Sequence, residues 1–247
     1  MAGLEEGVVL SLETSGDVCS VAVTRGRQFL IEHAFQHEMH LSERLMDIVN
    51  AALREAGVSL PEIALYAVGI GPGSFTGTRI GVMTAKTFAA VQEKPIVGVG
   101  GLEALAAEYA GVHKSIVVPM APCRAGVVYT RPFRVESEVP EPLAEVGALS
   151  ISDLAALLMG LPGENILCCG PAAARYAADL RQALPDAVHV TIGRAEFPRA
   201  SIIARLAVDR LASGAPPDDP IALVPLYVSP PPITIPKSAN RFQRAGP

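Results

Sequence analysis

Hydrophobic residues in the first third of the chain follow two different periods. Short apolar runs separated by the tight turns 15–17 and 25–27 predict three strands joined by hairpins. From Ser42 to Ala56, apolar residues instead recur every three or four positions, which predicts an amphipathic helix. Ser42 is suited to cap the start of this helix, and Gly57 is suited to end it.

A fourth strand and a second helix complete this part of the chain. The apolar run Ile63–Ile70 predicts the strand, and Ile80–Val91 predicts the helix. The expected order is strand, strand, strand, helix, strand, helix. The first three strands are expected at Val8–Glu13, Val18–Thr24 and Phe29–Phe35.

The second half of the chain repeats this order. Gly170-Pro171 stands after its fourth strand, where Gly71-Pro72 stands in the first half. The expected elements are strands at Ser115–Ala121 and Gly126–Phe133, a weaker strand within Arg134–Val146, a helix from the capping box Ser150–Asp153 to Met159, a strand at Ile166–Cys169 and a helix at Ala172–Leu184.

Two copies of βββαβα predict an α/β fold of two lobes with a cleft between them. This is the layout of the actin-like ATPase (ASKHA) class, which includes actin, sugar kinases and Hsp70, so the assignment is an analogy of fold. We expect a first lobe at 1–107 with a glycine-rich loop and docking helices. We expect a second lobe at 108–228, which includes a C-terminal helix at Ser201–Ala212. The proline-rich tail 229–247 is expected to be extended or disordered.

The composition narrows the class of protein. Half of the 247 residues are hydrophobic, which is typical of a globular chain, and the net charge of −5 argues against strong nucleic-acid binding by this chain alone. The N-terminus carries no apolar leader, and no run is long enough to span a bilayer. We therefore expect a cytoplasmic protein with no membrane association. The four cysteines, which show no metal-binding spacing, are expected to be buried free thiols.

The run Gly69–Arg79 is rich in glycine and lies between a predicted strand and a predicted helix. Backbone N–H groups and the positive end of a helix dipole at such a turn can hold an anion. The run lacks the lysine of a Walker loop and the glycine spacing of a dinucleotide fingerprint. An anion site and a tight turn without a ligand are both compatible with these residues.

Candidate catalytic residues are few. In the actin-like class, an acid at the end of the first strand holds a metal-bound water, and the hydroxyl residues after it face phosphate. Glu13-Thr14-Ser15 stands there, but the second lobe's counterpart, Ala121-Pro122-Cys123, has no acid. His37-Glu38-Met39-His40 is one residue too short for the zinc motif H-E-x-x-H. We therefore predict an incomplete catalytic cleft and no metal on this chain.

Small residues recur every fourth position at the start of the second helix: Gly77, Gly81, Ala85 and Ala89. Such a stripe lets another helix or strand approach closely. It can pack against this chain's own sheet or first helix, or it can receive a helix of another subunit.

Several segments together resemble the TsaB (YeaZ) family. They are Leu10–Ser15 with Cys19–Val23, His40–Leu45, the signature-like run Gly71–Gly81, and the C-terminal Pro225-Leu226-Tyr227-Val228. The likeness is strong over about the first hundred residues and weak in the second lobe. There, Ala121-Pro122-Cys123 replaces the family's usual acidic turn before Arg124, Gly126, Val128 and Tyr129, and the proline-rich tail also departs from the family's usual ending.

This resemblance implies a non-catalytic scaffold subunit. It would pair with the catalytic paralogue TsaD and act with the ATPase TsaE to transfer a threonylcarbamoyl group from threonylcarbamoyl-AMP to the adenosine next to the anticodon of tRNAs that read A-starting codons. ATP and a metal would then belong to the partner subunits, and tRNA would be reached only through the complex. The family name "glycoprotease-like" has no counterpart here, because no protease constellation is present.

The resemblance also implies roles for particular residues. A vestigial nucleotide or anion loop would contain Glu13, Thr14, Ser15, Gly71, Gly73, Ser74 and Thr76. The family pairs through helices of the first lobe, Ser42–Ala56 and Thr76–Val91 here, so the partner interface would contain His40, Leu41, Leu45, Ile48, Gly77, Arg79, Gly81, Ala85 and Ala89. A homodimer is expected to be possible when the partner is absent. The alternatives are a small ATP-dependent kinase of the same fold class and a metallopeptidase.

Overall fold

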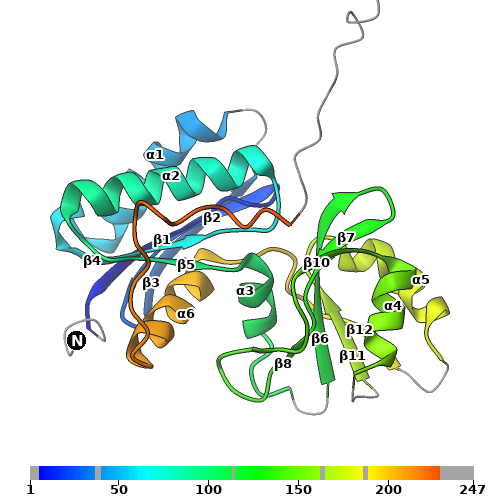
Figure 1. The fold of residues 1–247 in the computed structure, drawn as a ribbon. Coiled ribbons are helices and arrows are strands. Elements are labelled where there is room, and N and C mark those ends of the chain that lie inside the picture. The colour runs from blue at the N-terminus through cyan, green and yellow to red at the C-terminus, as the bar shows by residue number, and fades with distance from the viewer. Residues whose placement is uncertain (1–5, 37–39, 113–114, 162–164, 186–188, 229–247) are drawn as a thin grey trace, which may run out of the picture.

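Two sheets with the same strand order organise the chain (Figure 1). The computed structural model describes residues 6–36, 40–112, 115–161, 165–185 and 189–228. In the first sheet the order is β3-β2-β1-β4-β5, with β1 antiparallel to β2 and parallel to β4. Its strands are β1 (Val8–Glu13), β2 (Val18–Arg25), β3 (Gln28–Gln36), β4 (Ile63–Gly69) and β5 (Ile96–Val99).

The second sheet has the order β10-β7-β6-β11-β12, in which β6 takes the central place that β1 has in the first sheet. Here too the first partner is antiparallel and the second parallel. Its strands are β6 (Ser115–Arg124), β7 (Val127–Thr130), β10 (Gly147–Ser150), β11 (Asn165–Cys169) and β12 (His189–Ile192), with the short β8 (Phe133–Arg134) and β9 (Glu141–Pro142) beside them. The predicted repeat of elements and the actin-like α/β class are confirmed.

Each copy continues beyond βββαβα by one more strand and one more helix. In the first copy these are β5 and α3 (Gly101–Ala107), and in the second they are β12 and α6 (Ala200–Ala212). We predicted α6 alone among these four elements, and as Ser201–Ala212. β5, α3 and β12 are short elements of four to seven residues, so the hydrophobic pattern carries little signal for them.

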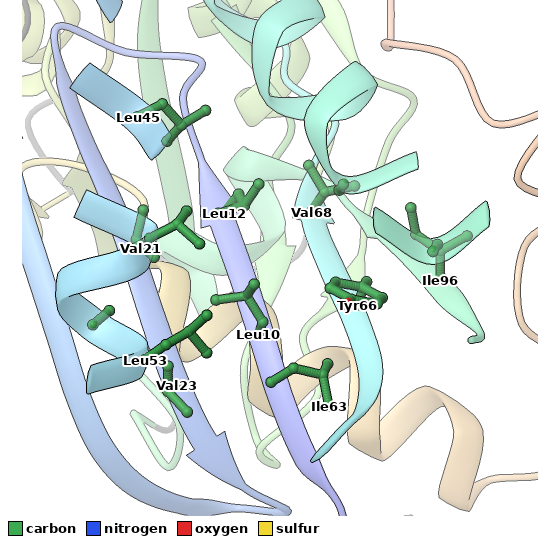
Figure 2. Close-up of a cluster of buried hydrophobic side chains, with 14 of the residues drawn as sticks. Leu10, Leu12, Val21, Val23, Leu45, Leu53, Ile63, Tyr66, Val68 and Ile96 are labelled. Atoms are coloured by element: carbon green, nitrogen blue, oxygen red, sulfur yellow. The ribbon is translucent and has the colours of Figure 1, made fainter. Parts of the chain in front are cut away.

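Helices α1 (Leu41–Ala56) and α2 (Phe75–Gln92) cover one face of the first sheet. Leu45 and Leu53 of α1 lie over Val21 and Val23 of β2, and Leu10 points to the same layer from β1 (Figure 2). Helices α4 (Ile151–Met159) and α5 (Ala173–Ala183) cover the second sheet in the same way. The short 3-10 turn Leu60–Glu62 leads into β4.

The last helix of each copy packs on the sheet of the other copy. Helix α6 packs on the free face of the first sheet, against Val9 and Leu65, although it follows the second lobe in the chain. Helix α3 follows the first lobe but packs on the free face of the second sheet, against Val117. Helix α6, which we grouped with the second lobe from its place in the chain, thus covers the first sheet, because both faces of β1 are apolar and need a cover.

Polar side chains of the first sheet fix the start of α6. Ser11 Oγ donates to the Ala200 carbonyl (2.7 Å), and Ser20 Oγ accepts from the Ala200 N–H (2.8 Å). From β3, the carboxylate of Glu32 accepts from the Ser201 N–H (3.0 Å) and pairs with Arg199 (2.6 Å). These contacts satisfy backbone groups at a buried helix end that would otherwise lack partners.

Two helix starts differ from the prediction. Helix α1 begins at Leu41, one residue before the expected cap Ser42, and its N-cap His40 makes no side-chain capping bond. Helix α2 begins at Phe75, because Ser74 Oγ caps it by accepting from the Gly77 N–H (3.2 Å). Gly77 and Arg79 are thus helical rather than part of the loop. The caps at Ser150 and Gly57 are confirmed.

The small-residue stripe of α2 faces this chain's own core. Added Cβ atoms at Gly77 and Gly81 would overlap Thr14 in the β1–β2 turn, and Ala85 and Ala89 are each 1% exposed within the first core. The interpretation of the stripe as a partner interface is therefore wrong. The other interpretation, packing against the chain's own sheet, describes the molecule, because a helix this close to β1 can carry only small residues on that side.

Among the described residues, no helix is both long and apolar enough to cross a membrane. The proline-rich tail 229–247, as well as His37, Glu38 and Met39, lies outside the described residues.

A substitution in the stripe tests this packing. In Gly81→Leu, the new side chain must displace Thr14 and separate α2 from the β1–β2 turn, so the free energy of unfolding should fall by about 1–3 kcal/mol or more. Ala90→Leu on the exposed side of the same helix should change it by less than about 0.5 kcal/mol. Urea unfolding followed by circular dichroism measures both. Equal unfolding midpoints for the two variants would contradict the assigned packing.

Candidate functional site in the interlobe cleft

A cleft with a cavity of about 350 Å³ separates the two lobes at the ends of β1 and β6. The first lobe contributes the β1–β2 turn and the start of α2, and the second contributes the end of β6, Tyr129 and Pro171. Helix α3 forms part of the wall through Leu102 and Leu105. Most of these side chains are apolar, and Asp17 is the one acidic residue among the described residues that line the cavity.

The glycine-rich loop is held against the chain rather than open to a ligand. Ser74 N–H donates to the Ser15 carbonyl (2.6 Å), and an added Cβ at Gly73 would overlap that same carbonyl. Gly71 has φ +91°, and its carbonyl accepts from the Gly101 N–H at the start of α3 (2.8 Å). The glycines therefore serve close contact between the loop, the β1–β2 turn and α3.

Glu13 is fully buried and does not line the cleft. Its Oε1 accepts from the Ser15 N–H (2.6 Å), while Oε2 is buried with no hydrogen-bond partner. That oxygen lies against Gly69, where any added Cβ would overlap it. Burial raises the pKa of the Glu13 carboxyl, and the hydrogen bonds from Ser15 and Thr14 oppose this only in part.

The other predicted loop residues divide into two groups. Thr14 is buried, and its Oγ1 donates to the Gly77 carbonyl of α2 (2.8 Å). Ser15, Gly73 and Ser74 line the cleft. Gly71 and Thr76 do not line it: Gly71 is buried, and Thr76 is exposed on α2. Three of the seven predicted residues therefore meet at one cavity.

The residues present do not fit a magnesium-bound nucleotide. The fold class implies such a group, but Glu13 is turned into the core and the second lobe offers Ala121, Pro122 and Cys123 to the cleft. Among the described residues, no three histidine, cysteine or acidic side chains are grouped to hold a metal ion. Hard cations bind carboxylate and carbonyl oxygens in sets, which this cleft does not offer.

The cysteines are free thiols, as expected from their apolar surroundings. Cys19, Cys168 and Cys169 are buried, and burial raises the pKa of Cys19 to about 12. Cys123 is half-buried at the cleft.

The predicted interface residues on α1 do not form one exposed surface. Leu41 and Leu45 are in the first core, Ile48 is half-buried and His40 is exposed. Arg79 of α2 is exposed, with its guanidinium 3.7 Å above the ring of Phe75. The exposed apolar side chains of these helices are instead Met46, Met83 and Val91, at 40%, 58% and 73% exposure. The predicted interface did not include these three residues, because the prediction rested on the spacing of small residues in α2.

Residues 215–228, which we call the C-terminal strap, close one side of the cleft. Leu226 N–H donates to the Ile70 carbonyl (2.8 Å), and Tyr227 Oη accepts from Arg79 Nε (2.7 Å). The Tyr227 ring lies 5.2 Å from that of Phe75, between centroids, so the strap covers the first turn of α2. The signal for this arrangement was the family-like run Pro225–Val228, whose position in space the sequence did not indicate.

Comparison with known proteins finds a family match over most of the chain. Residues 36–227, well over half of the chain, match the family model described as TsaD: tRNA N6-adenosine threonylcarbamoyltransferase. The tRNA threonylcarbamoyladenosine biosynthesis protein TsaB of Bacillus subtilis (strain 168) is 32% identical over 134 residues, 54% of this chain and 58% of that protein. The chain spans about half the length of the curated relatives it matches.

Solved structures show the same fold. YeaZ from Pseudomonas aeruginosa superposes with a TM-score of 0.73 at 24% identity, over 90% of this chain and 99% of that chain. A second structure from that organism, described as similar to the peptidase YeaZ, has a TM-score of 0.77 at 23% identity, over 90% and 100% of the two chains. The chain therefore belongs to the family described as TsaD: tRNA N6-adenosine threonylcarbamoyltransferase, and it is similar to the proteins named TsaB and YeaZ.

Proposed function

We propose that this chain is a non-catalytic subunit of the complex that makes threonylcarbamoyladenosine in tRNA. It pairs with a TsaD-type catalytic paralogue, and a TsaE-like ATPase completes the complex. The threonylcarbamoyl group passes from threonylcarbamoyl-AMP to N6 of the adenosine next to the anticodon, at the paralogue's active site. Membership in the TsaD family and the similarity to the TsaB protein of Bacillus subtilis support this proposal.

The observation that carries the proposal is the outer surface of α1 and α2. The two helices lie side by side on the first sheet (Figure 1), with Met46 and Met83 on their solvent side at 40% and 58% exposure. Exposed methionines on ordered helices are typical of surfaces that bind other proteins, because the side chain is apolar and adapts its shape. This α1–α2 surface is the proposed site of the paralogue, and of a second copy of the chain when the paralogue is absent.

The cleft supports a subunit without catalysis of its own. Phosphoryl and acyl transfer need positioned charges or a nucleophile with a base, and the cavity between the lobes is lined mainly by proline, leucine and aromatic side chains. ATP and the metal are accordingly assigned to the partner subunits. The net charge of −5 fits a subunit that meets tRNA only through the complex, in the cytoplasm where tRNA is modified.

Met83→Glu tests the assigned surface. A carboxylate buried at the centre of a protein interface should weaken binding of the paralogue by about 2 kcal/mol or more, roughly thirtyfold. The reconstituted complex, supplied with threonylcarbamoyl-AMP and tRNA, should lose modification in parallel. Isothermal titration calorimetry measures the affinity, and mass spectrometry of tRNA nucleosides measures the product.

Met159→Glu is the matched control, since Met159 is 64% exposed on α4 of the second lobe. It should leave affinity and modification unchanged. If Met83→Glu binds and modifies as well as Met159→Glu does, α2 is not the paralogue's site.

Glu13→Gln tests whether the buried carboxyl of Glu13 resists ionisation, and whether the negative charge is needed for activity. The raised pKa means that the folded state binds the proton more tightly than the unfolded chain, whose glutamate pKa is about 4.3. Ionising the Glu13 carboxyl therefore costs more free energy in the folded state than in the unfolded chain. As a result, the free energy of unfolding of the wild type falls as pH rises above about 4.3 toward the folded pKa. Glutamine does not titrate.

The free energy of unfolding of Glu13→Gln, minus that of the wild type, should thus increase from pH 4 to pH 7. Urea unfolding at several pH values measures this difference, and modification by the reconstituted complex should not change. A constant difference would show that Glu13 ionises normally. Magnesium-dependent ATP binding by the isolated wild-type chain that Glu13→Gln removes would instead support a kinase.

A further inference from the structure

The C-terminal strap is held in place by β5 and α6 at its start and by α2 farther on. It first pairs with the edge strand β5, where Asp218 N–H donates to the Ile96 carbonyl (2.9 Å) and Asp218 Oδ2 accepts from the Gly98 N–H (2.8 Å). Arg210 of α6 holds the same carboxylate at 2.7 Å. Farther on, Lys86 Nζ of α2 donates to the carbonyls of Ile221 (3.1 Å) and Leu223 (2.8 Å).

The strap therefore presents a fixed outer side to solvent. Leu223 packs inward on the first core, whereas Ile221 and Val224 are 88% and 60% exposed. Backbone hydrogen bonds at both ends and in the middle fix this segment before any partner arrives. A surface ordered in advance loses little conformational entropy when it binds.

The outer side of the strap continues the exposed face of α2. Arg79, Met83 and Lys86 are spaced four and three residues apart, so they share one face of the helix. Arg79 and Lys86 both bind the strap, which places Met83 at its border. Figure 1 shows the strap, coloured orange to red, running alongside α2.

The chemistry of this surface suits a protein and not a phosphate backbone. The strap engages both cations on this side of α2, because Arg79 donates to Tyr227 and Lys86 donates to two strap carbonyls. Arg79 also lies above the ring of Phe75 in α2 itself. Met83 of α2 and Ile221 and Val224 of the strap are large apolar side chains that remain exposed on these two neighbouring segments. Contiguous exposed apolar groups favour an apolar protein surface.

We propose that Ile221 and Val224 of the strap, together with Met83 of α2, form one apolar surface that binds the TsaD-type paralogue. This inference rests on the proposed function, which gives the α1–α2 surface to the paralogue and stops at α2. A partner seated on Met83 reaches the strap because both lie on the same side of the helix. The C-terminal segment is thus an interface element as well as a wall of the cleft.

Two single substitutions in the full-length chain test the strap. Ile221→Glu and Val224→Glu should each weaken binding of the purified paralogue at least about tenfold, measured by isothermal titration calorimetry. The matched controls are Ile192→Glu on β12 and Val139→Glu in the second lobe, which are 53% and 49% exposed and should bind as the wild type does. Unchanged thermal unfolding midpoints establish that the variants are folded.

The outcomes separate this inference from the proposed function. If Met83→Glu weakens binding while both strap variants match their controls, the strap is not part of the interface and the proposed function stands. If none of the three weakens binding, both are overturned. If the strap variants abolish self-association of the chain alone, seen by light scattering at rising concentration, but bind the paralogue normally, the strap joins two copies and the inference is overturned.

Discussion

Both sheets of this protein are apolar on two faces, and neither lobe provides from its own stretch of chain the helix that covers its second face. In β1 all six residues are buried, with even-numbered residues such as Leu10 facing α1 and α2 and odd-numbered ones such as Val9 facing α6. In β6 the same alternation places Val118 under α4 and α5 and Val117 under α3. Because α3 and α6 are exchanged, each lobe is completed by the other lobe's final helix.

This exchange determines where the cleft lies and what it contains. Helix α3 lies between the lobes and contributes Leu102 and Leu105 to the cavity, which is therefore lined mainly by apolar side chains. The backbone N–H groups of Ser74 and Gly77 at this helix start already donate to the Ser15 carbonyl and to Ser74 Oγ, so neither is free to hold a phosphate. The glycines of this run therefore allow close packing within the chain.

Much of the fold followed from hydrophobic patterning, and the exceptions have physical causes. The hairpins of the first sheet, the repeat of elements and the caps at Gly57 and Ser150 depend on residues close in sequence, which the pattern records. The exchange of α3 and α6 depends on contacts such as Val9 with Ile203, and no local pattern records a partner so distant. Four-residue strands such as β5 are too short to show a period.

The candidate site was predictable only in part for related reasons. Ser15, Gly73 and Ser74 do meet at one cavity, as the loop motif indicated. The burial of Glu13 could not be foreseen, because a charged residue at the end of a strand is ordinarily taken to face solvent or a ligand. The stripe of Gly77, Gly81, Ala85 and Ala89 was a true sign of close packing, but spacing alone does not say whether the neighbour belongs to the same chain or to another.

The exchanged helix also governs when the first lobe can be finished during synthesis. Proteins are made from the N-terminus, and domains usually fold in that order as they leave the ribosome. The face of the first sheet that carries Val9, Leu65 and Val97 waits for α6, which ends at Ala212. Nearly the whole described chain must therefore emerge before that apolar surface is covered, and until then the nascent protein presents to chaperones a hydrophobic sheet that the mature protein never shows.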